Sequence, residues 1–148
     1  METQDQKLLK FHGIDIVKVD FSSDKKFEPD KNNMDINIDA RVYYPKEKPN
    51  YFNIMMTVNI ESEDCFLLII HSIATFEFSE DINEGLKKNF INFNAPAIIF
   101  PYLRSFITSF TSSLGSSIPS ITIPIRFFRG EMEEINFETT EKITKENL

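Results

Sequence analysis

The sequence predicts an α+β domain in which a four-stranded antiparallel sheet is followed by a long helix and an apolar, proline-rich lid loop. Two observations lead to this prediction. In four segments between Ile14 and Phe78, apolar side chains recur at every second residue, as in strands with one buried face. From Asn94 onward they recur at intervals of three and four residues, as on one face of a helix. A chain of 148 residues is long enough for one such domain.

The first predicted strand, residues 14–21, contains a change of phase. Its apolar side chains occupy even positions up to Ile16 and odd positions from Val17 onward. A β-bulge opposes two consecutive residues to one residue of the partner strand, and so restores the alternation. We therefore expect a bulge or a strong bend here. A polar connection follows, and it carries one isolated aromatic residue, Phe27.

Residues 34–44 and 52–60 alternate between apolar and mainly polar side chains, which predicts the second and third strands. The segment 45–50 between them contains two prolines, which cannot extend a ladder, so it is a hairpin loop. The fourth strand, residues 65–78, is apolar on both faces as far as Ile70. We expect its outer face to be covered as well, for example by another subunit.

The remaining apolar pattern is helical. Residues 81–90 predict a short helix. A longer helix is predicted to begin at Asn94, its N-cap, with Pro96 in the first turn, and to stop at Gly115. Pro101 removes one helical hydrogen bond, so the helix either kinks there or begins there after an irregular turn. Its apolar stripe consists of Ile99, Phe100, Leu103, Phe106, Ile107, Phe110 and Leu114.

Two different segments follow the helix. Residues 115–128 combine large apolar side chains with Pro119 and Pro124, so neither a helix nor a central strand fits, and such a loop must lie on a surface. Residues 129–148 contain six Glu against three basic residues. The sequence therefore predicts one domain over residues 1–128 and an acidic C-terminal tail over residues 129–148, either a short helix or disordered.

The composition disfavours several classes of function. The formal net charge is −7, so a nucleic-acid partner is not expected, because phosphate backbones attract clustered basic side chains. The polar N-terminus lacks the layout of a signal peptide, and no apolar run is long enough to cross a bilayer. A single cysteine, Cys65, allows no intrachain disulfide, which fits a reducing compartment. We expect a cytoplasmic protein that is not inserted into a membrane.

No group of residues in the sequence is typical of catalysis. His12 and His71 lie in or beside predicted strands without metal-ligand spacing, and four glycines form no phosphate-binding loop. We therefore expect no enzyme, no cofactor and no metal. The apolar helix and loop exceed what the sheet can cover, which indicates either an oligomer interface or a groove for an apolar partner. A scaffold for one folded protein and a carrier of a small apolar ligand remain open.

Two motifs carry a resemblance to a known family. NAPAIIFPYLR at residues 94–104 and IPSITIPIRF at residues 118–127 resemble the helix start and the apolar lid loop of the SecB protein-export chaperones. The resemblance covers about residues 8–128. It implies a homotetramer, built as a dimer of dimers with helices between the sheets. It also implies a chaperone that holds unfolded or preprotein clients without ATP.

We expect clients to bind in a groove roofed by the apolar loop, because adaptable Ile, Met and Phe side chains suit unfolded chains. The predicted client-binding residues are Ile118, Ile121, Ile123, Ile125 and Phe127, with Phe27, Phe52 and Met55 as further candidates. The predicted oligomer interface consists of Ile99, Leu103, Phe106, Ile107 and Phe110.

The chain departs from the family at positions that bear on its partner. The family has Glu after the motif arginine, where this chain has Ser105. Acidic residues that contact the translocase motor SecA match Lys18, Ser22 and Ile69, none of them acidic. We therefore expect client holding, with SecA contact that is weak or relies on the acidic tail over residues 129–148. Some relatives serve antitoxins, so an antitoxin client is the alternative.

Overall fold

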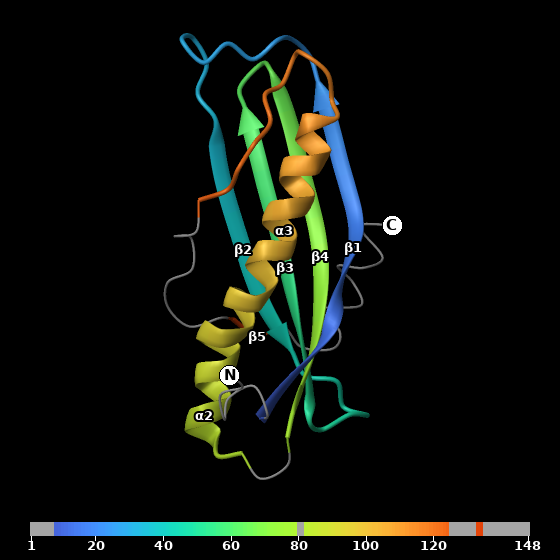
Figure 1. Cartoon of the computed structure of the whole chain (residues 1–148). Helices are drawn as coiled ribbons and strands as arrows, with labels where there is room; N and C mark the ends of the chain where they lie inside the picture. The colour runs from blue at the N-terminus through green and yellow to red at the C-terminus, as the bar shows by residue number, and fades with distance from the viewer. Residues whose placement is uncertain (1–7, 80–81, 125–132, 135–148) are drawn as a thin grey trace.

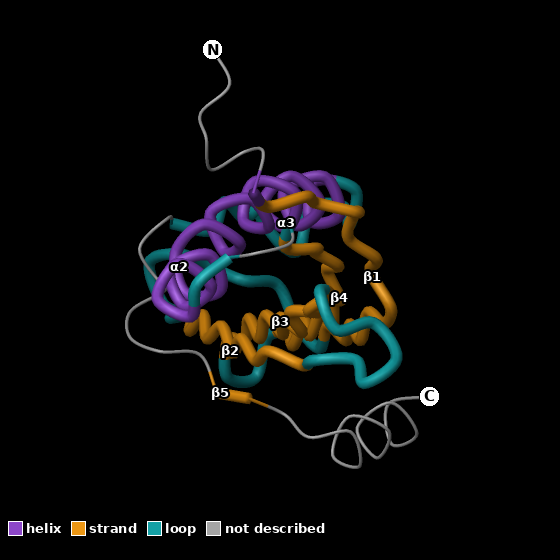
Figure 2. Tube along the Cα trace, turned by 90° about the horizontal axis from the view of Figure 1, so that it is seen from below, coloured by secondary structure: helices purple, strands orange, loops and turns teal. Residues whose placement is uncertain are grey.

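The computed structural model describes residues 8–79, 82–124 and 133–134, and in them a sheet is covered on one face by a helical segment (Figures 1 and 2). The elements in chain order are β1 (Leu9–Ser23), β2 (Asp35–Tyr43), β3 (Tyr51–Ser62), β4 (Phe66–Phe78), α2 (Glu84–Asn89), a π-helical turn (Phe90–Asn94), α3 (Ala95–Ser112) and β5 (Glu133–Glu134). The predicted α+β class, with four strands followed by a helix, is confirmed.

The sheet has the strand order β1-β4-β3-β2-β5. The first four strands are antiparallel neighbours, and because β1 returns beside β4 after the hairpin-connected run β2-β3-β4, they form a Greek key. The sequence did not predict β5, which pairs in parallel with β2 at Arg41 and Val42. Figure 2 shows the two layers from below, with β5 outside β2.

The phase change in the first strand is a β-bulge, as predicted. The pairing of β1 with β4 shifts register between Ile16 and Lys18. A second shift lies between Phe11 and Gly13, and Gly13 has a φ of 119°, a conformation that is strained for residues with a Cβ. β1 begins at Leu9, five residues before the predicted start. Before this irregularity the more buried side chains of β1 occupy odd positions and after it even positions, so the alternation that begins at Ile14 does not extend back to Leu9.

Every second side chain of the central strands points at the helix. The even-numbered residues of β3 and β4 are buried, whereas their odd-numbered neighbours are partly or fully exposed. Ile99, Leu103 and Ile107 of α3 are at most 1% exposed and belong to the same core. At one end of the core, the ring of Phe52 stacks 5.1 Å from Phe76 and 4.6 Å from Phe78.

α3 begins at Ala95, directly after the predicted N-cap residue Asn94, but the predicted capping role of Asn94 is wrong. Asn94 has helical angles (φ −74°, ψ −45°), and its side chain makes no capping hydrogen bond. The continuous helical segment begins earlier, after Asn83, whose side-chain oxygen accepts a hydrogen bond of 2.8 Å from the amide of Leu86. It continues through the wide π-helical turn that ends two residues before Pro96, which lacks the amide hydrogen that a regular α-turn would use.

The proline-rich loop lies on the core, as its composition predicts. Ile118, Ile121 and Ile123 are 3%, 4% and 0% exposed. The amide of Ile121 donates a hydrogen bond of 2.8 Å to the hydroxyl of Thr111, and the carbonyl oxygen of Ile121 accepts one of 3.0 Å from Thr108. Figure 1 shows the segment in orange, descending on the β2 side of α3. Two side chains with hydroxyl groups thus fix the loop against the helix.

Replacing Leu103 with Ala should lower the free energy of unfolding by about 2–5 kcal/mol, because it leaves a cavity between helix and sheet. The matched change Ser105→Ala, on the exposed side of the same helical turn, should change it by less than about 0.5 kcal/mol. Urea denaturation at one protein concentration measures both. Equal denaturation midpoints for the two variants would contradict the position of Leu103 in the subunit core.

Candidate functional site

One flank of α3 faces β1 and is aromatic. The Tyr102 ring lies 5.4 Å from Phe11, and the Phe110 ring lies 6.0 Å from Phe21 in an edge-on contact. Phe106 stacks on Phe110 at 5.9 Å. Tyr102 remains 53% exposed, so this flank presents apolar surface beside an edge strand of the sheet.

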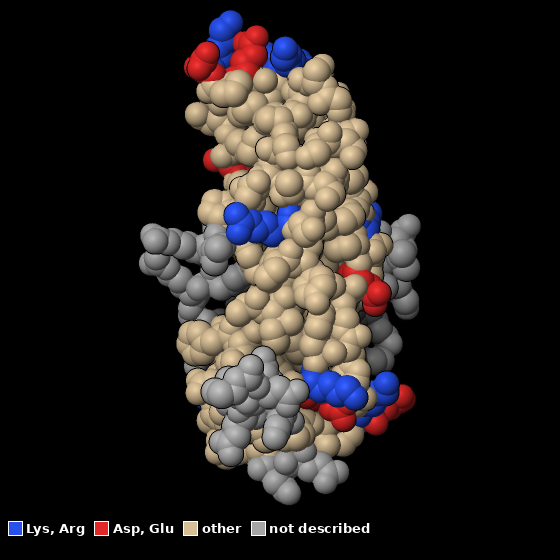
Figure 3. All heavy atoms as spheres, in the orientation of Figure 1, with Lys and Arg blue, Asp and Glu red and all other residues tan. Residues whose placement is uncertain are grey.

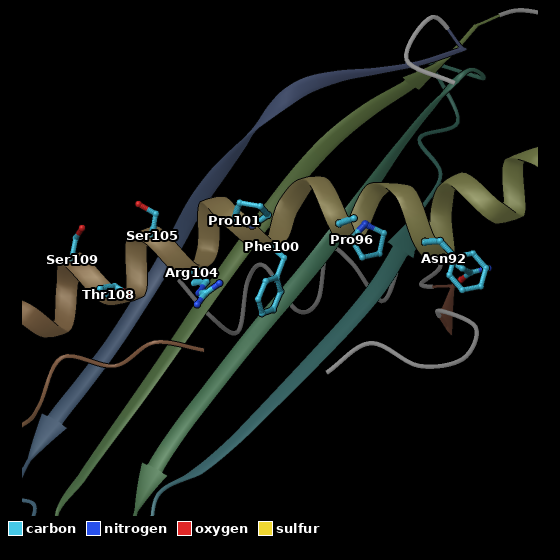
Figure 4. Close-up of a pocket in the computed structure, with 10 residues that line it drawn as sticks. Asn92, Pro96, Phe100, Pro101, Arg104, Ser105, Thr108 and Ser109 are labelled. Atoms are coloured by element: carbon cyan, nitrogen blue, oxygen red, sulfur yellow. The ribbon is translucent and has the colours of Figure 1, made fainter. Parts of the chain in front are cut away.

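The opposite flank of α3 forms a groove with a volume of about 580 Å³ (Figure 4). The described residues that line it belong to two rows with a spacing of four along the helix. They are Asn92, Pro96, Phe100, Arg104 and Thr108 in one row and Phe93, Ala97, Pro101, Ser105 and Ser109 in the other. All of them come from one continuous helical segment, so the described wall of the groove is one-sided.

The end of this groove nearest α2 is apolar. Phe93 is 66% exposed, which is unusual for a side chain of its size, and Ala97 is exposed as well, whereas Pro96 and Phe100 line the groove as buried side chains. The π-helical turn contributes Phe93 to the lining, because one extra residue in the turn changes the direction of the side chains before α3.

Pro101 leaves a backbone acceptor beside the groove. It lies inside α3 and is exposed, and since proline has no amide hydrogen, the carbonyl oxygen of Ala97 does not receive the usual hydrogen bond from residue 101. Both residues line the groove. Pro101, which the sequence predicts as a kink or a start of the helix, is therefore a source of polarity in an apolar wall.

Arg104 is the single charged residue of α3. Figure 4 shows its side chain pointing to the same side of the helix as Phe100, one turn before it. Ser105 and Ser109 in the neighbouring row are exposed, whereas the Thr108 hydroxyl is engaged with the loop. The groove thus changes from apolar to polar along its length.

The structure separates the predicted client-binding residues. Ile118, Ile121 and Ile123 are buried under the loop, Phe52 is fully buried in the sheet, and Met55 is half-buried on the outer face. Phe27 is 9% exposed and meets the Phe66 ring edge-on at 6.0 Å. Ile125 and Phe127 lie outside the described residues.

The prediction did not include the groove beside Phe93 and Arg104. The four-residue spacing of Phe93, Ala97 and Pro101 was the signal in the sequence that could have indicated it.

The predicted interface residues also divide into two groups. Ile99, Leu103 and Ile107 point into the subunit core. Phe106 and Phe110 are partly buried against that core on the β1 flank. Only the second group offers surface to another subunit in this conformation.

The outer face of the sheet brings together the positions matched to SecA contacts. Lys18 pairs with His71, and Ser22 pairs with Leu67. Asp20 pairs with Ile69 and lies 3.5 Å from the ammonium group of Lys18. One acidic residue therefore lies on this face at a position that the sequence matching did not include.

Both histidines have structural partners on this face. His71 Nδ1 is 3.1 Å from the Thr57 hydroxyl, and the ring nitrogen Nε2 of His12 is 2.8 Å from a carboxylate oxygen of Glu77. The hydrogen bond from His12 lowers the pKa of Glu77 below its usual value. Among the described residues, no group of three or more His, Cys, Asp or Glu side chains could hold a metal ion. In the same part of the chain, no helix is long and apolar enough to span a membrane.

Burial, and then the charge of Lys18, lowers the pKa of His71 below its usual 6.5. The unfolded chain therefore binds the proton more readily, and stability from this group should fall as the pH falls through about 6.5. Lys18→Met should raise the midpoint of His71 in an NMR titration, and Asp20→Asn should lower it. An unchanged midpoint in Lys18→Met would show that burial alone sets this pKa.

Comparisons with known proteins agree with this architecture. The model of the family described as "Preprotein translocase subunit SecB" matches residues 15–140. An uncharacterized protein of Methanocaldococcus jannaschii, MJ0357, is 29% identical over 150 residues, covering 96% of each chain. A solved structure of the Mycobacterium tuberculosis Rv1957 SecB-like chaperone, in complex with a ChAD peptide from the Rv1956 HigA1 antitoxin, superposes with a TM-score of 0.64. It covers 80% of this chain and 90% of that chain at 14% identity, and so supports the fold. The chain belongs to the SecB family, whose members are chaperones without enzymatic activity.

Proposed function

We propose that this protein holds unfolded or partly folded polypeptides on apolar surface, without ATP. The observation that carries the proposal is the groove along α3, in which a 66% exposed Phe93 leads into Pro96, Ala97 and Phe100. Unfolded chains share exposed apolar side chains and free backbone groups rather than a sequence. An apolar wall with few polar groups among its described residues suits such partners.

The binding energy of such a groove is sufficient without nucleotide hydrolysis. Burying one large apolar side chain contributes about 1.5–3 kcal/mol, so three or four contacts exceed the cost of ordering a short extended segment. The sequence has four glycines and no glycine-rich loop that could cradle a nucleotide's phosphates. Release then depends on the folding or transfer of the client itself.

The loop isoleucines Ile118, Ile121 and Ile123 belong to the proposed client surface only when the loop opens. In the closed position they are part of the core, and opening breaks the hydrogen bonds of Ile121 to Thr108 and Thr111. We propose that Phe93 makes the first contact, since its side chain is 66% exposed with the loop in place.

An antitoxin is the second candidate client. The observation that favours it is the fold similarity to Rv1957, whose structure contains an antitoxin peptide. Lys18, Ser22 and Ile69 are not acidic, and Asp20 on the same face lies 3.5 Å from the ammonium group of Lys18, so the proposed activity is holding of the client without transfer to SecA.

We propose in addition that the protein is a homotetramer. Among the described residues, β1 has β4 as its one neighbour, so its other edge can pair with a second subunit. The aromatic flank with Tyr102, Phe106 and Phe110 lies beside that edge and would be covered in the same contact. This contact joins two subunits, and two such pairs would form the tetramer with their helices between the sheets.

Phe93→Ser should weaken binding of a labelled unfolded polypeptide about tenfold, because the removed ring contributes a large part of the exposed apolar wall. Val17→Ser is the matched control, since Val17 is also exposed (48%) but lies on β1, away from the groove. Fluorescence anisotropy without ATP, together with suppression of client aggregation, measures the effect. Equal losses in both variants would contradict binding in the groove.

Phe106→Asp should dissociate the assembly, because it places an unpaired charge in a contact between apolar side chains. Asn37→Asp adds the same charge at an exposed position of β2 and should leave the assembly intact. Light scattering at micromolar concentration distinguishes the species. A monomeric wild-type protein would refute the proposed tetramer.

A further inference from the structure

The β1–β2 connection, the β3–β4 hairpin and the proline-rich loop meet at one end of the sheet, at the top of Figure 1. In the β1–β2 connection, the amide of Phe27 donates a hydrogen bond of 2.9 Å to the carbonyl oxygen of Ser117 in the loop. Further along the loop, Ile121 is hydrogen-bonded to Thr108 and Thr111 of α3. The loop is therefore fastened to both layers, to the strand layer at Ser117 and to the helix at Ile121.

Phe27 lies between two fixed parts of the β1–β2 connection. Before it, the amide of Asp24 donates a hydrogen bond of 2.7 Å to the carbonyl oxygen of Cys65 in the β3–β4 hairpin. After it, the amide of Asn32 donates to the carbonyl oxygen of Glu28 at 2.8 Å, and the side-chain oxygen of Asn32 accepts from the amide of Glu28 at 2.9 Å. The connection thus has a defined shape of its own, which directs the Phe27 amide at the loop.

The Phe27 side chain is the apolar part of a connection whose outer surface is charged. Figure 3 shows Lys or Arg side chains together with Asp or Glu side chains at the top of the same view. The Phe27 ring is 9% exposed and meets Phe66 edge-on at 6.0 Å. It shares the core cluster with Ile118, which is 3% exposed and directly follows Ser117.

The closed position of the loop and the position of Phe27 stabilise each other. If the loop lifted alone, the amide of Phe27 would lose its acceptor, and an unpaired donor in a buried position is unfavourable. If Phe27 left alone, the loop would lose its hydrogen bond to the strand layer, and the core around Ile118 would lose the contacts of a large ring.

We propose that the proline-rich loop and Phe27 leave the core together, as one opening unit, and that Phe27 acts as the latch of the loop. Phe27 is then a positioning residue, which controls when Ile118, Ile121 and Ile123 become accessible. This inference deepens the proposed holding function, on which its relevance to clients rests. The opening itself requires no client.

The single cysteine of the chain provides a probe of this opening. Cys65 is 1% exposed, and its thiol faces the carbonyl oxygen of Lys26, the residue before Phe27, at a distance of 3.9 Å. A thiol reagent reaches the sulfur when this part of the connection moves away. The amide of Ile121, which is bonded to Thr111, reports separately on the loop through its hydrogen exchange.

The test perturbs one side of the opening unit and measures the other. Thr111→Val removes the hydroxyl that accepts from the Ile121 amide, so it should raise the rate of Cys65 labelling by a maleimide about tenfold. In the opposite direction, Phe27→Ala should raise the hydrogen-exchange rate of the Ile121 amide about tenfold, because coupling between two sites is reciprocal.

A second loop variant and a matched control accompany this test. Thr108→Val removes the other hydroxyl that is bonded to Ile121, so it should accelerate Cys65 labelling as well. Thr57→Val also removes a threonine hydroxyl, but that one pairs with His71 on the outer face of the sheet, so the labelling rate should stay unchanged.

The outcomes distinguish a joint local opening from its alternatives. If Thr111→Val accelerates exchange of the Ile121 amide but leaves Cys65 labelling unchanged, the loop opens alone and the coupling is refuted. If Leu103→Ala accelerates the labelling at least as much as Thr111→Val does, the thiol becomes accessible through unfolding of the whole subunit, and the joint local opening is refuted. None of these measurements contains a client, so a failure of the holding function would leave their results unaffected.

Discussion

One helix has to cover one face of a four-stranded sheet, and it is too narrow to do so. Strands spaced about 4.8 Å apart make a layer about 19 Å wide, whereas a helix with its side chains is about 10 Å across. α3 lies over the middle of the sheet, where Ile99, Leu103 and Ile107 meet the buried residues of β3 and β4. Apolar surface remains on both sides of it, and the other features of the fold can be understood as ways of covering that surface.

The two sides are covered differently. Toward β1, aromatic side chains from both layers reach across the gap, as in the contacts of Phe110 with Phe21 and Tyr102 with Phe11. Toward β2, the proline-rich loop returns along the helix and places Ile118, Ile121 and Ile123 in the core. The groove lies on this second flank, where the helix presents side chains beyond those that the loop meets. The loop is thus primarily a part of the core.

Strand positions could be predicted from the sequence because a strand with one buried face imposes a period of two. Even the irregularity after Ile16 was visible, since a bulge changes the phase of the alternation. The start of the helix could not be predicted in the same way. Asn94 before Pro96 is a good local capping signal, but the preceding residues are held helical by contacts of Phe90 and Ile91 with the core. Tertiary packing therefore overrides the local preference.

The same limit applies to the candidate site. Ile121 and Phe93 look alike in a sequence, as large apolar residues outside the strands, yet one is 4% and the other 66% exposed. The burial of Ile121 depends on two hydroxyl groups: that of Thr108 donates a hydrogen bond to its carbonyl oxygen, and that of Thr111 accepts one from its amide. Both threonines lie ten or more residues before Ile121 in the sequence. No local pattern indicates such a pairing. The spacing of four between Phe93, Ala97 and Pro101 is visible in the sequence. The apolar stripe that contains Leu103 is longer and more apolar, however, so it dominates the helical pattern.

Placing an apolar binding surface on a helix has a physical consequence for a protein that holds unfolded chains. An open strand edge presents a row of unpaired backbone groups, on which bound clients could pair and then recruit further chains. A helix satisfies most of its own backbone, so α3 offers side chains and, because of its prolines, a few carbonyl oxygens such as that of Ala97. On the sheet, the edge strand β2 is paired at Arg41 and Val42 by β5. The groove can therefore be apolar enough to bind many sequences while it provides little template for a growing sheet.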